Sequence, residues 1–82
     1  MSTYERLKDI IIDRTGIDES AINPEALLVD YLDLDSLDLV EIVMHAEDAF
    51  GVMVDDEVLE KIVTVQDAVS AIDAALTEVR KP

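Results

Sequence analysis

The chain of 82 residues contains no cysteine, which excludes disulfide bonds and any chemistry that uses a thiolate of the protein itself. Basic residues are also scarce, because six Lys and Arg stand against 20 Asp and Glu, for a net charge of −14. Nucleic-acid binding needs a basic surface that neutralises phosphates, so this composition excludes a nucleic-acid partner. The acidic balance instead predicts partners with basic surfaces, and repulsion between copies favours a monomer.

Long apolar runs are missing as well. No segment approaches the roughly 18 residues of a membrane-spanning helix, and the first residues, MSTYERLKDI, lack the profile of a signal peptide. We therefore expect a cytoplasmic protein without stable membrane association. Hydrophobic residues nevertheless make up 50% of the chain and recur periodically, which does not suit a disordered acidic segment.

The apolar residues recur at intervals of three and four, which is the spacing of helices. We expect a single domain over residues 1–82 with an all-α fold, a small four-helix bundle. Its three longer helices and its short third helix are expected at about 3–15, 36–50, 65–79 and 56–61. The long loop between the first two helices covers residues 16–35, and Asn23-Pro24-Glu25 predicts a short turn of helix inside it.

Residue types at the helix ends support these bounds. Asp35 and Asp38 in DSLD, and Thr64 and Asp67 in TVQD, have the spacing of residues that cap a helix start. Gly16 and Gly51 are the expected stops of the first two longer helices. Arg80 and Lys81 follow the last helix, where positive charge complements the helix dipole.

The segment 36–50 has two apolar faces on a helical wheel. The face expected to pack on the core comprises Leu39, Ile42, Val43, Ala46 and Phe50. On the opposite side Leu37, Val40 and Met44 lie among the carboxylates of Asp38, Glu41, Glu47 and Asp48. A helix buried on all sides is the alternative, but four carboxylates at these spacings do not suit one. The pattern favours a surface that binds a partner.

Ser36 is the candidate for chemistry at the start of this helix. As a catalytic nucleophile it has no base, because the single histidine, His45, lies too far along the same helix for a hydrogen bond. A calcium loop is excluded too, since Asp38 and Met44 occupy the positions that require glycine and glutamate. We expect no dedicated metal site. On spacing alone, Ser36 simply helps the helix to begin.

The runs DSLDLVEIVM, EDAFGV and DDEVLEKIVTVQDAVSAI resemble acyl carrier proteins of the discrete bacterial type over nearly the whole chain. The resemblance implies a carrier and not an enzyme. It implies that 4′-phosphopantetheine, taken from coenzyme A, is attached to Ser36 between Asp35 and Leu37, and that acyl groups are held on its thiol as thioesters. A chain without cysteine would then acquire its thiol from a prosthetic group. A helix start also favours the negative phosphodiester.

The same resemblance implies two groups of site residues. Basic docking patches of partner enzymes would meet Asp35, Leu37, Asp38, Val40, Glu41, Met44, Glu47, Asp48, Asp56 and Glu60. Those partners would be a phosphopantetheinyl transferase (holo-acyl-carrier synthase), a malonyl transferase, ketosynthases, reductases, dehydratases and acyltransferases of fatty-acid synthesis. The acyl chain would be sheltered in an interior lined by Val43, Ala46, Phe50, Val54, Leu59, Ile62, Ala68 and Ile72.

Some positions depart from the family pattern. Asp33 and Leu34 stand where many members have glycine and a small residue, Met53 where an acid is frequent, and Asp55 where proline is common. These departures leave the attachment serine in place and leave the partner set open. The alternatives are a carrier dedicated to a polyketide or other specialised acyl pathway, and an acidic helical adaptor with no prosthetic group.

Overall fold

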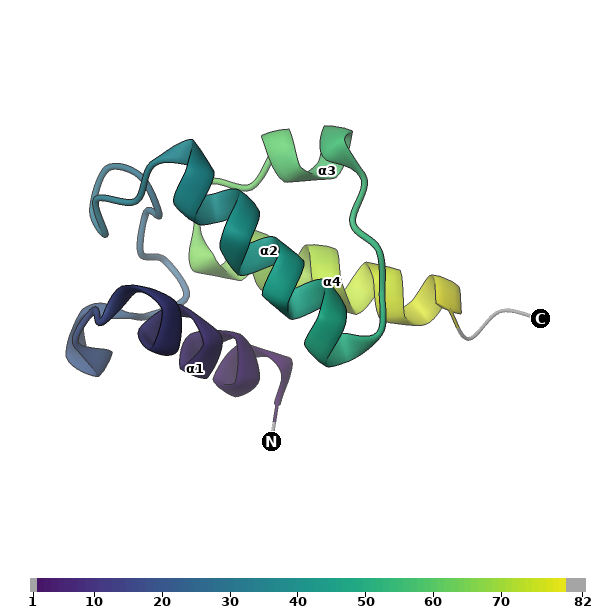
Figure 1. Ribbon diagram of the computed structural model, residues 1–82, viewed down its shortest axis with the longest axis horizontal. Helices are drawn as coiled ribbons and strands as arrows, with labels where there is room; N and C mark the ends of the chain where they lie inside the picture. Colours follow the sequence, from purple (N-terminus) through teal and green to yellow (C-terminus); the bar gives the residue numbers. More distant parts are fainter. Residues whose placement is uncertain (1, 80–82) are drawn as a thin grey trace.

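Residues 2–79 are described by a computed structural model, and within them the chain forms four α-helices. Their bounds are α1 (Thr3–Thr15), α2 (Ser36–Phe50), α3 (Asp56–Glu60) and α4 (Val65–Val79). The all-α bundle is therefore confirmed. In Figure 1, α1 and α3 lie on opposite sides of α2, and the long loop connects α1 to the start of α2. Arg80 and Lys81 lie outside the described residues.

The two expected glycine stops have the backbone conformation that only glycine adopts without cost. Gly16 and Gly51 have φ angles of 75° and 69°, in the left-handed region. Their N–H groups donate to the carbonyl oxygens of Ile12 and Glu47, which would otherwise lack a partner at the helix end. The short α3 ends at Glu60, one residue before the expected bound.

The core forms where α1, α2 and α4 pack against one another. The long loop closes it with its own apolar side chains. Ile22, Leu28 and Leu32 of this loop are buried, and Ile17 is half-buried. The buried hydrophobic residues are Leu7, Ile11, Ile22, Ala26, Leu28, Leu32, Leu34, Ile42, Ala46, Val52, Ile62, Val65, Ala68, Val69, Ile72 and Ala75.

The turn predicted at Asn23-Pro24-Glu25 is present, and Asn23 Oδ1 accepts a hydrogen bond from the N–H of Glu25 at 3.0 Å. The loop also contains a short helix that the sequence does not predict. A 3₁₀ helix covers Glu19–Ala21, where the Asp18 side chain accepts a hydrogen bond from the N–H of Ser20. Residues 23–26 form only a single turn, closed by the N–H of Ala26 donating to the carbonyl of Asn23 at 3.0 Å. The helix does not continue there because the backbone next becomes extended at Leu27.

Leu27 forms an isolated β-bridge with Thr64, immediately before α4. The N–H of Leu28 donates to the carbonyl of Val63 at 2.9 Å, and the N–H of Val65 donates to the carbonyl of Ala26 at 3.1 Å. This bridge fixes the long loop to the start of α4. None of the helices in residues 2–79 combines the length and the hydropathy needed to span a membrane.

Candidate functional site at the start of α2

The start of α2 is fixed by a reciprocal cap. Asp35 Oδ1 accepts a hydrogen bond from the N–H of Asp38 at 2.9 Å, and Asp38 Oδ2 accepts one from the N–H of Asp35 at 3.2 Å. The interpretation of DSLD as a helix start is thus confirmed. The capping role belongs to Asp35, and Ser36 is the first helical residue.

Ser36 is exposed, and no residue in the described part of the chain forms a hydrogen bond with its hydroxyl. The backbone N–H groups of Ser36 and Leu37 belong to the first turn, where the helix itself supplies no acceptor, and neither has a partner among residues 2–79. An anion attached at Ser36 would lie next to these two donors and the positive end of the helix dipole. The position therefore fits a negatively charged group.

The chain reaches this helix start through a constrained backbone. Asp33 has a φ angle of 58°, which makes it the one residue other than glycine with positive φ among those described. Leu32 and Leu34 on either side of it are buried, so the turn cannot relax without exposing them. Aspartate tolerates the left-handed conformation better than most residues. Aspartate can therefore occupy this turn position without glycine.

A cleft opens directly beside Ser36, between α2 and the segment that contains α3. Its volume is about 330 Å³, and we call it the Ser36 cleft. Apart from Ser36 and Glu60, the residues that line it are apolar: Val29, Leu39, Val40, Leu59 and Ile62.

A second space, the central cavity, lies inside the bundle. Its volume is about 20 Å³, and its lining is wholly apolar: Leu7, Ile42, Val43, Ala46, Val54, Ile62, Ala68, Ala71 and Ile72. Ile62 lines both spaces, so a single side chain separates the Ser36 cleft from the central cavity at that point.

Most of the residues predicted to line an acyl pocket meet at these two spaces. The central cavity contains Val43, Ala46, Val54, Ile62, Ala68 and Ile72, and the Ser36 cleft contains Leu59. Phe50 lines neither, because its ring packs beneath the guanidinium of Arg6, whose carbon lies 4.2 Å from the ring centroid. The sequence missed Leu7, Ile42 and Ala71, since a helical pattern alone does not show which core residues border a gap.

Comparison with known proteins identifies the family. A family model described as a phosphopantetheine attachment site matches residues 5–72. An acyl carrier protein of Solidesulfovibrio magneticus is 48% identical over 73 residues, which cover 89% of this chain and 94% of that protein. An acyl carrier protein of Thermotoga maritima is 52% identical over 73 residues, which cover 89% and 90%. The chain belongs to the acyl carrier proteins. It is a carrier of acyl chains and not an enzyme, and its prosthetic group is 4′-phosphopantetheine.

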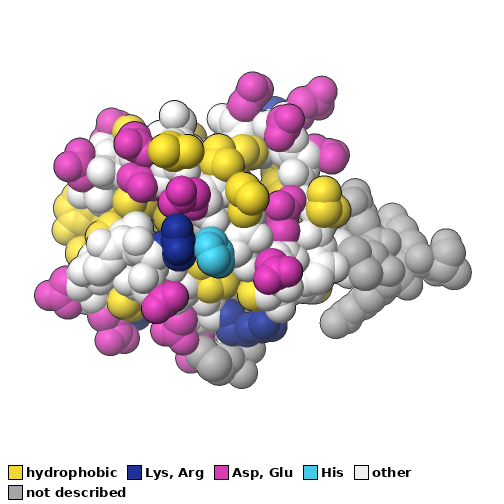
Figure 2. All heavy atoms as spheres, in the orientation of Figure 1, with side chains coloured by type: hydrophobic (Ala, Val, Ile, Leu, Met, Phe, Trp, Pro, Cys, Tyr) yellow, Lys and Arg dark blue, Asp and Glu magenta, His cyan; other side chains and the backbone are white. Residues whose placement is uncertain are grey.

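In this acyl carrier protein, α2 has the two apolar faces expected from its sequence. Ile42 and Ala46 are buried against α1 and α4. On the other side Leu37, Val40 and Met44 expose 65%, 38% and 60% of their surface, which is unusual for a group of large apolar side chains. Figure 2 shows hydrophobic side chains bordered by acidic ones on the face that carries α2 in Figure 1.

The acidic side chains around this apolar group are not equivalent. Glu41 forms an ion pair with Arg14 of α1, with Oε2 and Nη2 3.1 Å apart. Glu47 Oε2 accepts a hydrogen bond from the N–H of Val54 at 2.7 Å and so holds the connection between α2 and α3. Asp48, Asp56 and Glu60 are exposed, with no ion pair or side-chain hydrogen bond to any described residue. Acyl carrier proteins interact with fatty-acid synthesis enzymes in general, and these free carboxylates are the ones that a basic partner can reach without competition.

Proposed function

We propose that Ser36 is the residue that carries 4′-phosphopantetheine, and that the protein delivers acyl intermediates to the enzymes of fatty-acid synthesis in the cytoplasm. The observation that carries the proposal is the exposed Ser36 hydroxyl, which has no hydrogen-bond partner among residues 2–79 and lies beside an apolar cleft. The bound group supplies a thiol that holds the acyl chain as a thioester, and a thioester makes the acyl carbonyl open to attack. The catalytic groups for each reaction belong to the partner enzymes.

The residues around Ser36 have defined tasks in this proposal. The Ser36 oxygen forms the bond to the phosphate, and the N–H groups of Ser36 and Leu37 are placed to stabilise its negative charge. Asp35 and Asp38 use their carboxylates to cap the helix. The carboxylates of Asp35 and Asp38 would repel the phosphate. This repulsion is reduced because one oxygen of each carboxylate accepts a hydrogen bond from a backbone N–H group.

We also propose that the bundle shelters the acyl chain. The Ser36 cleft provides an apolar path away from the attachment residue, and Ile62 connects it to the central cavity. At about 20 Å³ the central cavity has room for little more than one water molecule in the unloaded protein. The bundle must therefore expand to admit a chain. Because α3 is five residues long and contains no buried residue, it is the element that can move at the lowest cost.

The exposed face of α2 is proposed to dock the partner enzymes. Leu37, Val40 and Met44 provide an apolar centre. Asp48 on α2, and Asp56 and Glu60 on α3, provide free negative charge at its edge. Charge at the edge of an interface accelerates encounter without creating high affinity, which suits a carrier that must bind and leave each enzyme in turn. The proposed partners are a phosphopantetheinyl transferase, a malonyl transferase, ketosynthases, reductases, dehydratases and acyltransferases.

The attachment residue is tested by intact mass. Wild type, Ser36→Ala and Ser20→Ala are incubated with coenzyme A, Mg²⁺ and a broad-specificity phosphopantetheinyl transferase. Ser20 is a matched control because it is also an exposed serine. We expect one phosphopantetheine on wild type and on Ser20→Ala, and none on Ser36→Ala. Modification of Ser36→Ala would assign the site elsewhere, and a folded, unmodified wild type that gains no mass would favour the adaptor.

The docking surface is tested by charge reversal. We expect Asp48→Lys to slow the transfer of a malonyl group to the protein that carries phosphopantetheine with a free thiol. The rate of this transfer should also depend less on salt concentration. Glu41→Lys is expected to act in the same direction, but it also brings a second positive charge to Arg14, so its stability must be measured as well. Unchanged kinetics for Asp48→Lys would remove Asp48 from the docking surface. Loading by an amino-acid-activating enzyme in place of a malonyl transferase would contradict the fatty-acid assignment.

A further inference from the structure

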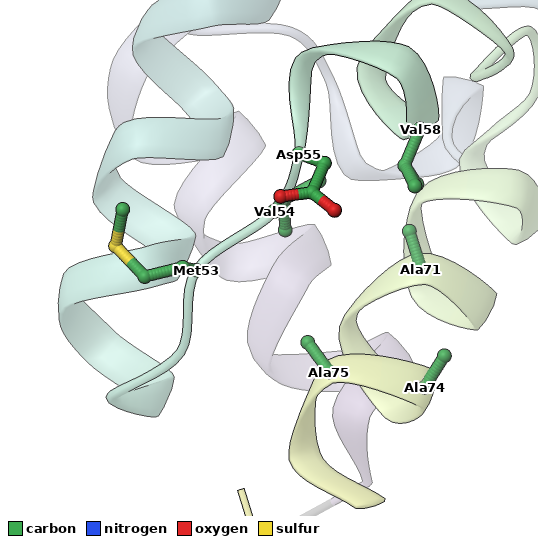
Figure 3. Close-up of a pocket in the computed structure, with 7 residues that line it drawn as sticks. All are labelled: Met53, Val54, Asp55, Val58, Ala71, Ala74 and Ala75. Carbon is green, nitrogen blue, oxygen red and sulfur yellow. The ribbon is translucent and has the colours of Figure 1, made fainter. Parts of the chain in front are cut away.

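A third space lies on the outside of the bundle, between the start of α3 and the middle of α4. This outer hollow has a volume of about 80 Å³. Figure 3 shows Val58 of α3 and Ala71 of α4 pointing toward one another across it, with Ala75 pointing toward Val54. The hollow exists because α4 presents three alanines, Ala71, Ala74 and Ala75, where longer side chains would fill the gap.

The outer hollow is adjacent to the central cavity. Val54 and Ala71 line both of them, so these two side chains form the wall between the spaces. Ile62 has the same position between the central cavity and the Ser36 cleft. The three spaces therefore follow one another from Ser36 to the hollow between α3 and α4. The residues at the boundaries, Ile62, Val54 and Ala71, are all apolar, and the side chains of Ile62 and Val54 can change rotamer.

We propose that the outer hollow receives the far end of long acyl chains, while shorter chains end in the central cavity. This inference rests on the proposed attachment at Ser36 and on the proposed sheltering of the chain. A saturated chain suits the site because, apart from Asp55, the hollow is lined by apolar residues: Met53, Val54, Val58 and the three alanines. The one charged group of the lining, Asp55, lies at the start of α3 and disfavours a chain that ends in a carboxylate.

Ala71 would then determine the length of chain that the protein can shelter. Its side chain is a single methyl group, so the wall at this point is thin. Ala71→Leu would thicken the wall and fill part of the outer hollow, while leaving the Ser36 cleft unchanged. Ala49→Leu is the matched control, because Ala49 is exposed on α2 and lines none of the three spaces.

The test uses alanine methyl groups as probes of position. Ala46 and Ala68 line the central cavity, Ala74 and Ala75 line the outer hollow, and Ala49 lies outside both. The protein is labelled at its alanine methyls and loaded with butyryl, decanoyl or hexadecanoyl chains that are deuterated except at the terminal methyl. Nuclear Overhauser effects then show which alanines the chain end contacts. We expect decanoyl to contact Ala46 and Ala68, and hexadecanoyl to contact Ala74 and Ala75.

The variants and the negative outcomes separate the inference from the proposed function. Ala71→Leu should abolish the contacts of hexadecanoyl with Ala75 and preserve those of decanoyl with Ala46, and Ala49→Leu should preserve both. If the hexadecanoyl end contacts Ala46 and Ala68 but never Ala75, the inference is overturned and the sheltering proposal stands. If no chain contacts any of these alanines, both are overturned. The mass measurement on Ser36 is independent of either result.

Discussion

The assignment of the α2 cap to Asp35 and not to Ser36 leads to a quantitative prediction. Asp35→Ala removes the side-chain oxygen that accepts the N–H of Asp38 at 2.9 Å. Loss of such a cap costs about 1 kcal/mol, within a range of about 0.5–2 kcal/mol. For a domain of this size the melting temperature should fall by about 4–8 °C per kcal/mol. Ser36→Ala removes no hydrogen bond to a described residue, so its stability should change by less than about 0.5 kcal/mol.

The charge of Asp35 complicates this comparison, since its removal also reduces the net charge of −14. Asp35→Asn is the matched control, because asparagine caps a helix as well as aspartate does and has lost the same charge. Urea and thermal unfolding, followed by far-UV circular dichroism, give the free energy of unfolding of all three variants. We expect Asp35→Asn to retain most of the stability that Asp35→Ala loses. The reasoning is refuted if Ser36→Ala is destabilised as much as Asp35→Ala, or if Asn and Ala at position 35 are equally destabilising.

Three further predictions follow from the strained turn, the second cap and the net charge. Asp33→Gly should be more stable than Asp33→Ala by about 1 kcal/mol in urea unfolding, because both lose the same charge and only alanine resists a φ of 58°; equal stability would contradict this. Hydrogen bonds from the backbone N–H groups of Thr64 and Val63 lower the pKa of Asp67, so its contribution to stability is complete above its unfolded pKa and is lost as the pH falls through the lower folded pKa. The difference in urea midpoint between wild type and Asp67→Asn should therefore begin to shrink below about pH 4 and continue to shrink as the pH falls further. A difference that does not shrink with falling pH would count against the assignment. Added salt or Mg²⁺ should raise the melting temperature, because screening relieves the repulsion among the 20 acidic residues, and no change with ionic strength would disprove the idea.

The parts of the fold that could be predicted from the sequence are those fixed by local patterns. The helix bounds, the Gly16 and Gly51 stops and the two caps depend on residues within one or two turns of each other. The exposed apolar group on α2 was predictable for the same reason, because a helical wheel places Leu37, Val40 and Met44 on one side without knowledge of the neighbours. The bridge between Leu27 and Thr64 was not predictable, since these two residues are far apart in the chain.

In the candidate site, too, the local features could be predicted and the contacts between distant residues could not. Ser36, Asp35 and Asp38 are neighbours in sequence and their arrangement at the helix start was expected. Phe50 was expected to line the acyl pocket, yet it packs against Arg6, because the face of a helix does not specify which partner from another helix covers each residue. Ala71 was missed because the sequence of a helix does not show where its neighbours leave a gap. Only the three-dimensional structure shows that this small side chain borders two spaces.

The reciprocal cap of Asp35 and Asp38 has a consequence for the order of events in the life of the protein. Because the helix start is complete without the Ser36 hydroxyl, the chain can fold before anything is attached to it. If Ser36 carries the prosthetic group as proposed, the transferase meets a helix that is already folded. Its affinity is then not reduced by the entropy of ordering this backbone. In the proposed docking mode, the later enzymes bind the same helix, whichever acyl chain is attached. Every enzyme could therefore recognise one surface of the protein, and would distinguish the acyl intermediates by the prosthetic group and its acyl chain.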